Sequence, residues 1–531
     1  MSGPRNPSRF AALISRFRRD KKANVAVMFG IALVPILTAI GCATDYSLAV
    51  RMKAKMQSAA DGASVSSIST NSAGYLAATQ MTSDGTVSAG VTDANNIFNG
   101  NVSGVPGYTN LSLTTTVTKT KAILKSNIQF SAQVPTTFLG LIGYPSLTIT
   151  GSSSASASLP LYLDFYLALD VSGSMGLPST TAEAQRMQSV NPDNYRQYPT
   201  GCTLACHFQP SNSACTDSGT QGYPTGNLCW GYAISRVSQS GYQNLLVLQS
   251  PQGKYPFKNP TTGKYQQLPT TITSATNPIN SLNAALTPVA NCPTDGTDAC
   301  IQLRLDAVGY AVNQLFVTAN NTAKISKQFR IGLYPFIRYL YQYFPLTSSI
   351  NGSTTDSSTI NYAAANLATL LDTNMNASLG SGGTHIDTAL SSVSSLVATV
   401  GDGSATTSTL PYVFLITDGA QDNQVKGVPN GSWSGSNQAT TINATTVCKP
   451  LKDRGIVISV LYIPYQTINP VNTSFAGNED TYANNNIANI PSSLQACASP
   501  GFFYTANTPT DITTALNAMF NHAVVTAHIT N

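Results

Sequence analysis

The chain has 531 residues, of which only 10% are charged, and it carries a formal net charge of +5. A chain of this length can hold two or three domains with a full-sized core, which excludes a mini-protein. Few charges combined with abundant Ser, Thr, Asn and Gly favour an exported, β-rich protein over a typical cytosolic enzyme. The positive charge is local, because residues 1–24 contain seven Lys or Arg and one Asp. We therefore expect no nucleic-acid partner.

An apolar run at residues 25–43 follows the basic segment directly. In a helix that rises about 1.5 Å per residue, this run crosses roughly the 30 Å hydrocarbon core of a bilayer. A cleaved signal peptide is the alternative, but its apolar core is usually only about 7 to 15 residues long. The basic side of a membrane segment stays in the cytoplasm. We therefore predict a cytoplasmic segment at 1–22, a transmembrane helix at 23–43, and a single-pass inner-membrane protein whose bulk is periplasmic or extracellular.

Beyond the membrane run, apolar residues recur at the spacing of one helix face; they are Leu48, Met52, Met56, Ala60 and Ala63. The spacing predicts that the helix leaves the bilayer as a stalk, and a helix packed on its own domain is the alternative.

Residues 70–158 are predicted to form strands and turns. The runs 111–123 and 122–134 are rich in Thr, Val and Ile and are typical of a β-hairpin or meander. A small, Ser-rich run at 147–157 then leads into the next domain. We interpret residues 44–158 as a helical stalk followed by a small β-rich region.

From about residue 160, apolar strand-like runs alternate with helical periodicity. This alternation is typical of an α/β domain with a doubly wound, mostly parallel sheet covered by helices, here predicted for residues 159–531. The predicted strands are 161–170, 329–336, 412–417, 456–463 and 502–504, with an antiparallel edge strand at 338–344. Predicted helices begin near Leu305, at Thr384 and near Ile512, and Asp387 lies three residues after Thr384, as in a capping box.

The motif Asp170-Val-Ser172-Gly-Ser174 ends the first of these strands. Alternate side chains of an extended segment point the same way, so one carboxylate and two hydroxyls can converge on a small hard cation. Two later segments complete the set. Thr384 follows two Gly residues at the start of a predicted helix, and Asp418 follows another predicted strand.

These residues resemble the metal-ion-dependent adhesion site of von Willebrand factor A domains, in which a DxSxS motif, a distant Thr and a distant Asp surround Mg²⁺. All five positions match, so the resemblance implies a magnesium site, with Mn²⁺ or Ca²⁺ as alternatives. The implied ligands are Asp170, Ser172, Ser174, Thr384 and Asp418. Because so few anionic ligands reach the ion, we expect an open position that a partner's carboxylate fills. Such a site favours binding over catalysis.

Simpler interpretations exist for single residues. Asp170 and Ser172 could satisfy turn amides or cap a helix. Asp422 and His385 are interpreted as solvated loop residues, and Met175 as loop packing. A Ser nucleophile needs a nearby base, but none of the four His has a recognisable triad context. His385 is the sole candidate, because it follows Thr384. We therefore predict no catalytic residue and no enzyme.

A long stretch at about 176–299 separates the first strand from its helix and is far longer than a usual βα loop. We interpret it as a disulfide-rich insertion that emerges beside the predicted metal, with a disordered insertion as the alternative. Eight cysteines lie beyond the membrane run and predict four disulfides in an oxidising compartment; they are Cys202, Cys206, Cys215, Cys229, Cys292, Cys300, Cys448 and Cys497. Half of a zinc site at Cys202, Cys206 and His207 is the alternative for part of this set.

The N-terminal segment also resembles that of TadG-like proteins of tight-adherence (Flp) pilus systems. The resemblance rests on Arg-Arg-Asp-Lys-Lys before the apolar run and on Gln-Ser-Ala-Ala-Asp-Gly-Ala at 57–63. Ala23 departs from the Gly expected there in many relatives. The segment 134–150 looks like the corresponding TadG-type region as well.

Two disulfide pairs are predicted individually. Cys292 with Cys300 would close a short loop within the insertion. The resemblance implies that Cys448 pairs with Cys497 and ties a late helix to the last strand.

Together, the two resemblances imply a membrane-anchored, non-enzymatic protein that helps to assemble or anchor a pilus. It would bind a protein partner, a pilus or envelope component, through that partner's carboxylate and the bound Mg²⁺. A surface or pilus-tip adhesin that binds host or matrix protein is the alternative. A periplasmic metal-dependent hydrolase is less favoured.

Overall fold

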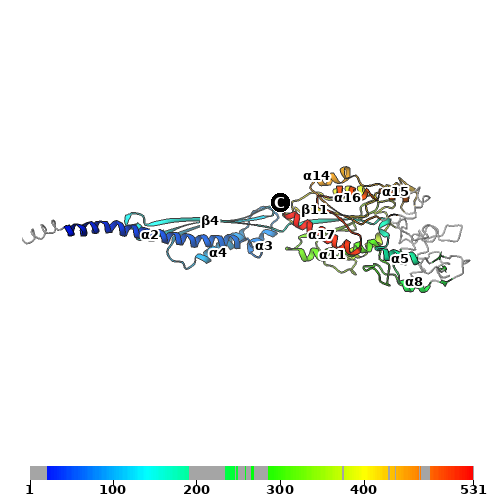
Figure 1. The fold of residues 1–531 in the computed structure, drawn as a ribbon, viewed down its shortest axis with the longest axis horizontal. Helices are drawn as coiled ribbons and strands as arrows, with labels where there is room; N and C mark the ends of the chain where they lie inside the picture. Colours follow the sequence, from blue (N-terminus) through cyan, green and yellow to red (C-terminus); the bar gives the residue numbers. More distant parts are fainter. Residues whose placement is uncertain are drawn as a thin grey trace, which may run out of the picture. The chain divides into compact units, whose positions relative to one another are not determined.

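The computed structural model describes residues 21–190, 232, 234–245, 247–248, 257–258, 265–267, 285–372, 376–428, 431–436, 438–465, 467 and 479–529. The chain divides into two compact units, Met1–Leu159 and Pro160–Asn531. Figure 1 shows the elements of each unit in chain order.

The first unit is built on one long helix, α2 (Lys21–Ser66). Its N-terminal half exposes apolar side chains such as Phe29 and Ile31, and by length and composition it fits a single-pass membrane anchor, as predicted. Its C-terminal half buries Met56 and Ala60 against the rest of the unit. Of the two readings of this half, packing on its own domain is therefore correct.

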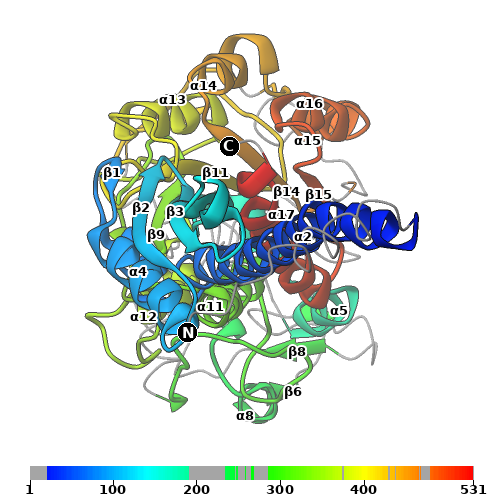
Figure 2. The ribbon, with the colours of Figure 1, turned by 90° about the vertical axis from the view of Figure 1, so that its left-hand side faces the viewer.

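Two further helices, α3 (Ala73–Gln80) and α4 (Ser88–Val102), correct the expectation of strands and turns from residue 70 onwards. Gly, Asn and Thr lower the helix propensity of α4, which is why its sequence did not predict a helix. Tertiary packing overrides that preference, because Ala94 and Phe98 are fully buried in one cluster with α2. Figure 2 shows α4 beside α2.

The antiparallel sheet of this unit has the order β1-β2-β3-β4, formed by β1 (Gly85–Thr86), β2 (Thr109–Thr120), β3 (Ile123–Pro135) and β4 (Ser146–Ser158). The predicted hairpin is confirmed as β2 and β3, which pair from Thr120↔Ile123 outward. The Ser-rich run at 147–157 leads up to the second unit, which begins at Pro160, as expected. It forms β4, which pairs along the whole of β3, and its small side chains alternate between half-buried and exposed.

The second unit contains a six-stranded sheet with the order β10-β9-β5-β11-β14-β15. Its strands are β5 (Leu163–Asp170), β9 (Phe329–Phe336), β10 (Phe344–Thr347), β11 (Leu410–Thr417), β14 (Val457–Tyr462) and β15 (Phe503–Thr505). The edge strand β10 is antiparallel, and the other neighbours pair in parallel. The predicted doubly wound, mostly parallel α/β fold is confirmed.

The predicted edge strand at 338–344 lies too early in the chain. Residues Arg338 and Tyr339 instead donate their backbone N–H groups to the Leu379 carbonyl, and Tyr341 donates to Pro335. Alternating aromatic residues gave this turn the appearance of a strand. It forms only an isolated bridge from Leu340 to Phe336, and the continuous strand β10 begins at Phe344.

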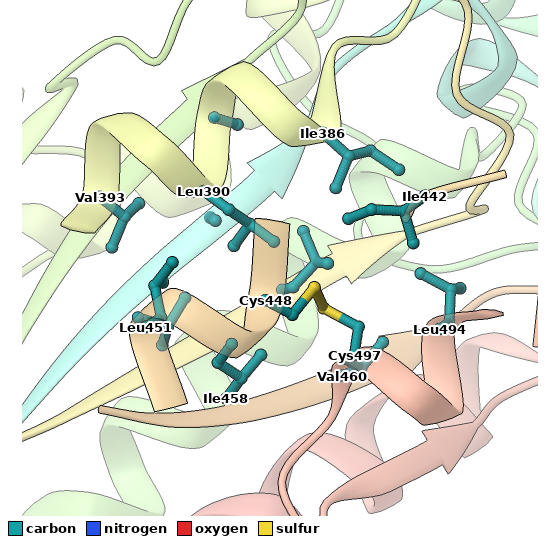
Figure 3. Packing of buried hydrophobic residues seen from close by; sticks show 14 of the residues in the cluster. Ile386, Leu390, Val393, Ile442, Cys448, Leu451, Ile458, Val460, Leu494 and Cys497 are labelled. Atoms are coloured by element: carbon teal, nitrogen blue, oxygen red, sulfur yellow. A yellow bond between two sulfur atoms is a disulfide. The ribbon is translucent and has the colours of Figure 1, made fainter. Parts of the chain in front are cut away.

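Helices cover both faces of the sheet, and the central strand β5 is therefore buried along its whole length. On one face, Phe165 of β5 contacts Phe520 of α17 (Pro509–Ile529), which packs against α11 (Arg304–Thr322). On the other face, Tyr166 and Ala168 join a cluster with α13 (Ile386–Leu396), α14 (Lys449–Asp453) and α16 (Ile490–Cys497). Figure 3 shows the helical side of this second cluster.

The remaining short elements are η1 (Leu139–Ile142), η2 (Gly173–Gly176), α5 (Thr181–Val190), α8 (Gln239–Leu245), β6 (Val247–Leu248), β7 (Phe257–Lys258), β8 (Tyr265–Gln267), α12 (Ile360–Ala365), η4 (Leu367–Leu370), β12 (Val425–Lys426), β13 (Trp433–Ser434), η5 (Ala444–Cys448) and α15 (Glu479–Asn486).

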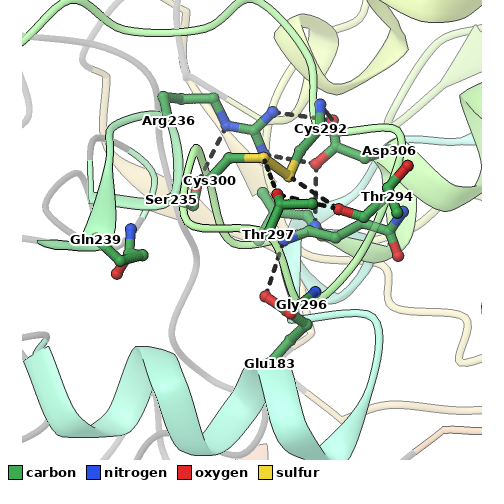
Figure 4. Close-up of a disulfide and its surroundings, with 12 residues drawn as sticks. Glu183, Ser235, Arg236, Gln239, Cys292, Thr294, Gly296, Thr297, Cys300 and Asp306 are labelled. Carbon is green, nitrogen blue, oxygen red and sulfur yellow. Dashed lines mark hydrogen bonds and ion pairs between the residues drawn. A yellow bond between two sulfur atoms is a disulfide. The ribbon is translucent and has the colours of Figure 1, made fainter.

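The described ends of the insertion are fastened around the Cys292–Cys300 disulfide, which confirms that predicted pair (Figure 4). The buried carboxylate of Asp306 on α11 forms a bidentate ion pair with Arg236 at 2.9 and 2.6 Å. The buried Glu183 carboxylate accepts the backbone N–H of Gly296 at 2.6 Å. Buried carboxylates therefore help to hold the described ends of the insertion in place.

The other four cysteines of the predicted set lie outside the described residues, and so does the zinc alternative; these residues are Cys202, Cys206, Cys215, Cys229 and His207.

The Cys448–Cys497 disulfide confirms the second predicted pair, but its ends differ from the prediction. It joins the last residue of η5 to the last residue of α16, so it links two helical segments and not a helix to the last strand. Both sulfur atoms are buried in the cluster between these helices and the sheet (Figure 3).

We expect the Cys448–Cys497 disulfide to be the more stabilising of the two. By the loop-entropy relation, closing its 49-residue separation is worth about 4 kcal/mol, against about 2.5 kcal/mol for the 8-residue separation of Cys292–Cys300. Urea unfolding of the full chain in detergent checks this with two double variants, Cys448→Ala with Cys497→Ala and Cys292→Ala with Cys300→Ala. An equal or larger loss in the second variant would contradict the expectation.

Candidate metal centre

The candidate site lies at the carboxyl ends of β5 and β11, the two central strands. Strand order reverses between them, and in open α/β sheets ligands bind at this switch point. The two strands run in parallel register up to Leu169↔Ile416. Asp170 and Asp418 therefore follow directly at one edge of the sheet.

The loop after β5 buries all three side chains of the motif, with Asp170, Ser172 and Ser174 at most 9% exposed. The Asp170 carboxylate accepts the backbone N–H of Ser172 at 3.0 Å, and the two Ser hydroxyls lie 3.3 Å apart. The expected extended alternation holds as far as Ser172, after which η2 begins at Gly173. The motif residues still converge, because the helical turn folds Ser174 back beside Ser172. Met175 packs in the interior, as expected.

Thr417 is part of the site, although the sequence analysis did not select it. Its hydroxyl donates to Asp170 Oδ2 at 2.7 Å and accepts the backbone N–H of Gly419 at 2.9 Å. The side chain thereby joins the ends of the two central strands. Its position directly before Asp418 was the signal that could have identified it.

Asp418 is fully buried, and neither of its carboxylate oxygens has a described donor at good hydrogen-bond geometry. The Ser174 hydroxyl and the Ala420 N–H still lie close enough to lower its pKa. The nearest cation is Arg304, at the start of α11, whose Nη1 lies 3.7 Å from Asp418 Oδ2 and makes no hydrogen bond. Nη2 of the same side chain donates to the Pro464 carbonyl at 3.2 Å. Arg304 was also missed, and its signal was a charged residue at the start of an otherwise apolar helix face.

The electrostatics of the pair are unfavourable without a further cation. Burial raises the pKa of Asp170, although hydrogen bonds from Ser172 and Thr417 oppose the rise. Burial, and then the charge of Asp170, raise the pKa of Asp418 to about 7, with Arg304 opposing. Burial also lowers the pKa of Arg304. Two buried carboxyl groups at close range favour either a proton or a bound cation.

Thr384 lies on the neighbouring loop and is buried. Its backbone exchanges two hydrogen bonds with Asp422, each of 3.0 Å. Asp422 is therefore a buried bridge partner and not the solvated loop residue that was expected. Gly383, with φ +67°, makes this bridge possible, because a Cβ there would lie 2.3 Å from the Asp422 carbonyl oxygen.

The predicted capping box at the start of α13 is wrong. The helix begins after His385, and no side chain caps it. Asp387 accepts the backbone N–H of Thr388 at 2.7 Å, so it does not reach back to Thr384. The Thr384 hydroxyl is not used as a helix cap.

Asp372 fastens this loop to the motif loop and was not predicted. Its carboxylate accepts the Ser381 hydroxyl at 2.8 Å and the Gly382 N–H at 3.0 Å. Its own N–H donates to the Val171 carbonyl at 3.2 Å. No sequence pattern marked it, since it stands in a loop far from any motif.

His385 is half-buried, and its Nε2 lies 2.9 Å from the Gln424 carbonyl oxygen. One ring nitrogen of His385 is therefore engaged with a backbone carbonyl, and that His385 is not a general base stays a prediction.

The side chains fit a small hard cation. Asp170, Ser172, Ser174 and Asp418 converge at one sheet edge, with Thr384 on the adjoining loop, and all five offer oxygen, which Mg²⁺ prefers. The strongest sign of this fit is Asp418, whose buried oxygens lack a hydrogen bond of good geometry and face a single guanidinium at 3.7 Å. Among the described residues, no three His, Cys, Asp or Glu side chains gather as a metal-binding group, so the hydroxyls are needed to complete the set.

In comparisons with known proteins, part of the chain matches one sequence family. Residues 23–67 match the Flp pilus-assembly TadE/G-like family, which confirms the resemblance found in the N-terminal sequence. No curated protein sequence matches this chain.

Several solved structures are similar at low identity. The proximal thread matrix protein 1 from the mussel byssus, with a zinc-occupied MIDAS motif, is 15% identical, with 41% of this chain and 43% of that chain covered and a TM-score of 0.26. This chain thus spans less than half of that protein's length. The PilB minor pilin from Streptococcus sanguinis is 10% identical over 78% of each chain, with a TM-score of 0.28. The vWF domain of the type V pili tip protein Mfa5 from Porphyromonas gingivalis is 12% identical over 43% of this chain and 88% of its own, with a TM-score of 0.25.

We expect Gly383→Ala to destabilise the protein more than Gly296→Ala. Both glycines have positive φ, but only the first methyl group would meet backbone atoms, whereas nothing lies within 4 Å of the second. Gly296→Ala should cost only the left-handed backbone strain, roughly 1–2 kcal/mol. Thermal unfolding of the full chain in detergent checks this. Equal losses would mean that the loop carrying Thr384 adapts without cost.

Proposed function

We propose that this chain, whose residues 23–67 match the TadE/G-like pilus-assembly family, is a membrane-anchored, non-enzymatic protein that assembles or anchors a pilus. Asp170, Ser172, Ser174, Thr384 and Asp418 hold a Mg²⁺ ion, with Mn²⁺ or Ca²⁺ as alternatives. A carboxylate of a pilus or envelope protein binds at this site.

The observation that carries the proposal is the carboxylate of Asp418, which is buried beside Asp170 and has a guanidinium at 3.7 Å but no hydrogen bond of good geometry. With both acids ionised, Asp170, Asp418 and Arg304 leave one net negative charge in a buried place. A divalent ion changes that balance to one net positive charge, which an incoming carboxylate neutralises. The site therefore suits an anionic partner, and burial strengthens the attraction.

The individual residues have distinct tasks. Ser172, Ser174 and Thr384 supply neutral oxygens, so the ion keeps enough positive charge to attract a further anionic ligand. Thr417 orients Asp170 through its hydroxyl, as an outer hydrogen-bond partner does for a ligating carboxylate. Asp372 and the bridge to Asp422 hold the loop of Thr384.

Binding is favoured over catalysis because, among the residues that the structure describes, we identify no general base for Ser172 or Ser174. His385 is engaged with the Gln424 carbonyl, and both acids are adjacent to the candidate ion position. Export completes the proposal: the N-terminus is cytoplasmic, and the bulk of the chain lies in the periplasm or outside the cell. This orientation follows from the basic residues before the apolar helix.

We expect wild-type protein to take up Mg²⁺ and the Ser172→Ala, Ser174→Ala double variant to lose that uptake. At an ion concentration of about 100 times Kd, binding stabilises the folded chain by about 2.7 kcal/mol. A chelator should therefore lower the melting temperature of the wild type and leave that of the variant unchanged. Calorimetric titration with Mg²⁺ and with Mn²⁺ measures uptake directly.

A matched control lies before β11, where Ser404 and Ser408 donate their hydroxyls to Asp402 at 2.6 and 3.1 Å. The Ser404→Ala, Ser408→Ala double variant removes two hydroxyls from one carboxylate without touching the candidate site. It should bind Mg²⁺ like the wild type. Wild-type protein that shows no heat of binding, with a melting temperature indifferent to chelator, would disprove the metal site.

We further expect in-cell crosslinking to capture pilus components with the wild type and to lose them with the Ser172→Ala, Ser174→Ala variant. Mass spectrometry identifies the captured proteins. Equal recovery from both would show that the cation is structural and not the point of contact. Protease treatment of intact cells distinguishes the adhesin alternative, because only a surface-exposed domain would be removed.

A further inference from the structure

A loop of the first unit, residues 136–145, stands out by its exposed apolar side chains; we call it the apolar loop. It connects β3 to β4 and contains η1. Its two ends are closed by a hydrogen bond from the Thr136 N–H to the Pro145 carbonyl at 3.0 Å and by one from the Thr136 hydroxyl to the Tyr144 carbonyl. The loop is thus a defined structure.

Asp45 of α2 holds the apolar loop on the helix. Its carboxylate accepts three successive backbone N–H groups, from Thr137 at 3.1 Å, Phe138 at 2.7 Å and Leu139 at 2.8 Å. Such charge-assisted hydrogen bonds are roughly twice as strong as neutral ones. The three N–H groups also provide the Asp45 carboxylate with hydrogen-bond donors in an otherwise apolar part of the helix.

Gly41, one turn before Asp45, permits the close approach of the loop. A Cβ at this position would lie 2.2 Å from the Phe138 ring, so only Gly leaves space for it. The apolar loop is therefore fastened to α2 between residues 41 and 45.

The apolar loop turns most of its large apolar side chains outward. Leu141 is 83% exposed, Ile142 54% and Tyr144 62%, and Phe138 is exposed as well. The chain carries no Asp, Glu, Lys or Arg between Lys125 and Asp164, so no charge interrupts this surface. An exposed patch of this kind marks an interaction site or a membrane contact.

The attachment point coincides with the end of the membrane span. Twenty residues separate Val25 from Asp45, and at about 1.5 Å each they cover about 30 Å, the thickness of the hydrocarbon core. Between Lys22 and Arg51, Asp45 is the one charged residue, and the loop itself satisfies it. The apolar surface of α2 thus continues directly into that of the loop.

We propose that the apolar loop inserts into the outer interfacial layer of the bilayer that α2 crosses. Phe138 and Tyr144 then lie at the level where aromatic side chains favour the membrane interface, and Leu141 and Ile142 reach towards the acyl chains. The proposal rests on the membrane anchor of the proposed function. A second copy of the chain is the competing occupant, but continuity with the exposed apolar side of α2 favours the lipid.

Depth-dependent fluorescence quenching tests the proposal. The full chain, with Trp230→Phe and Trp433→Phe to remove the native Trp residues, is reconstituted into vesicles of phosphatidylcholine with brominated or unbrominated acyl chains. Three single variants are compared: Ile142→Trp in the loop, Phe29→Trp in the span, and Leu76→Trp on α3. Leu76 is a matched control, because it is 54% exposed like Ile142 and lies in the same unit.

We expect the brominated lipid to reduce the emission of the Phe29→Trp and Ile142→Trp variants and to leave that of Leu76→Trp unchanged. Adding Asp45→Ala should release the loop, so that the Ile142→Trp variant loses its quenching while Phe29→Trp keeps it. Quenching of Phe29→Trp alone would overturn the loop proposal and leave the anchor intact. Quenching of none of the three would refute the anchor as well. Equal quenching of all three would mean that the loop lies no deeper in the bilayer than α3, and this would also contradict the loop proposal.

Discussion

The interaction on which the second unit depends is the burial of two carboxyl groups, Asp170 and Asp418, at the ends of adjacent parallel strands. A buried charge is costly unless it is paired or hydrogen-bonded. Asp170 meets this cost through Thr417 and the Ser172 N–H. Asp418 has a guanidinium at 3.7 Å and no hydrogen bond of good geometry. Such an arrangement is unfavourable for stability alone, and it makes sense where a cation from outside the chain completes the charge balance.

The strand order of the sheet places Asp170 and Asp418 next to each other. The chain adds strands on one side of β5 and then on the other side of β11, so loops from these two parallel strands leave in opposite directions at their carboxyl ends. Buried contacts fix each loop: Asp372 links the loop of Ser381 to the chain after β5, and Gly383 allows the bridge to Asp422. The disulfide of Cys448 anchors the helical segments that cover the neighbouring face. Little of the site can move without disturbing the core.

The sequence predicted the features that depend on neighbouring residues, namely the buried strands and the points where they end. The strands β5, β9 and β11 are continuous apolar runs, which is typical of strands buried on both faces, and their ends therefore marked Asp170 and Asp418. Interactions between distant segments could not be read in the same way. Arg304 and Asp372 reach the site through tertiary packing, α4 is helical because Phe98 is buried against α2, and the Ser-rich β4 is a strand because β3 pairs with it. The metal ligands themselves stay a proposal.

The continuity of α2 has a mechanical consequence. One helix, Lys21–Ser66, extends from its apolar half, which contains Pro35, into the half that packs on the antiparallel sheet. Transmembrane helices adjust their tilt to bilayer thickness. An interior proline lacks a backbone N–H and permits a bend, so a change of tilt in the lipid would be divided between a bend at Pro35 and a rotation of the sheet that packs on the helix beyond it.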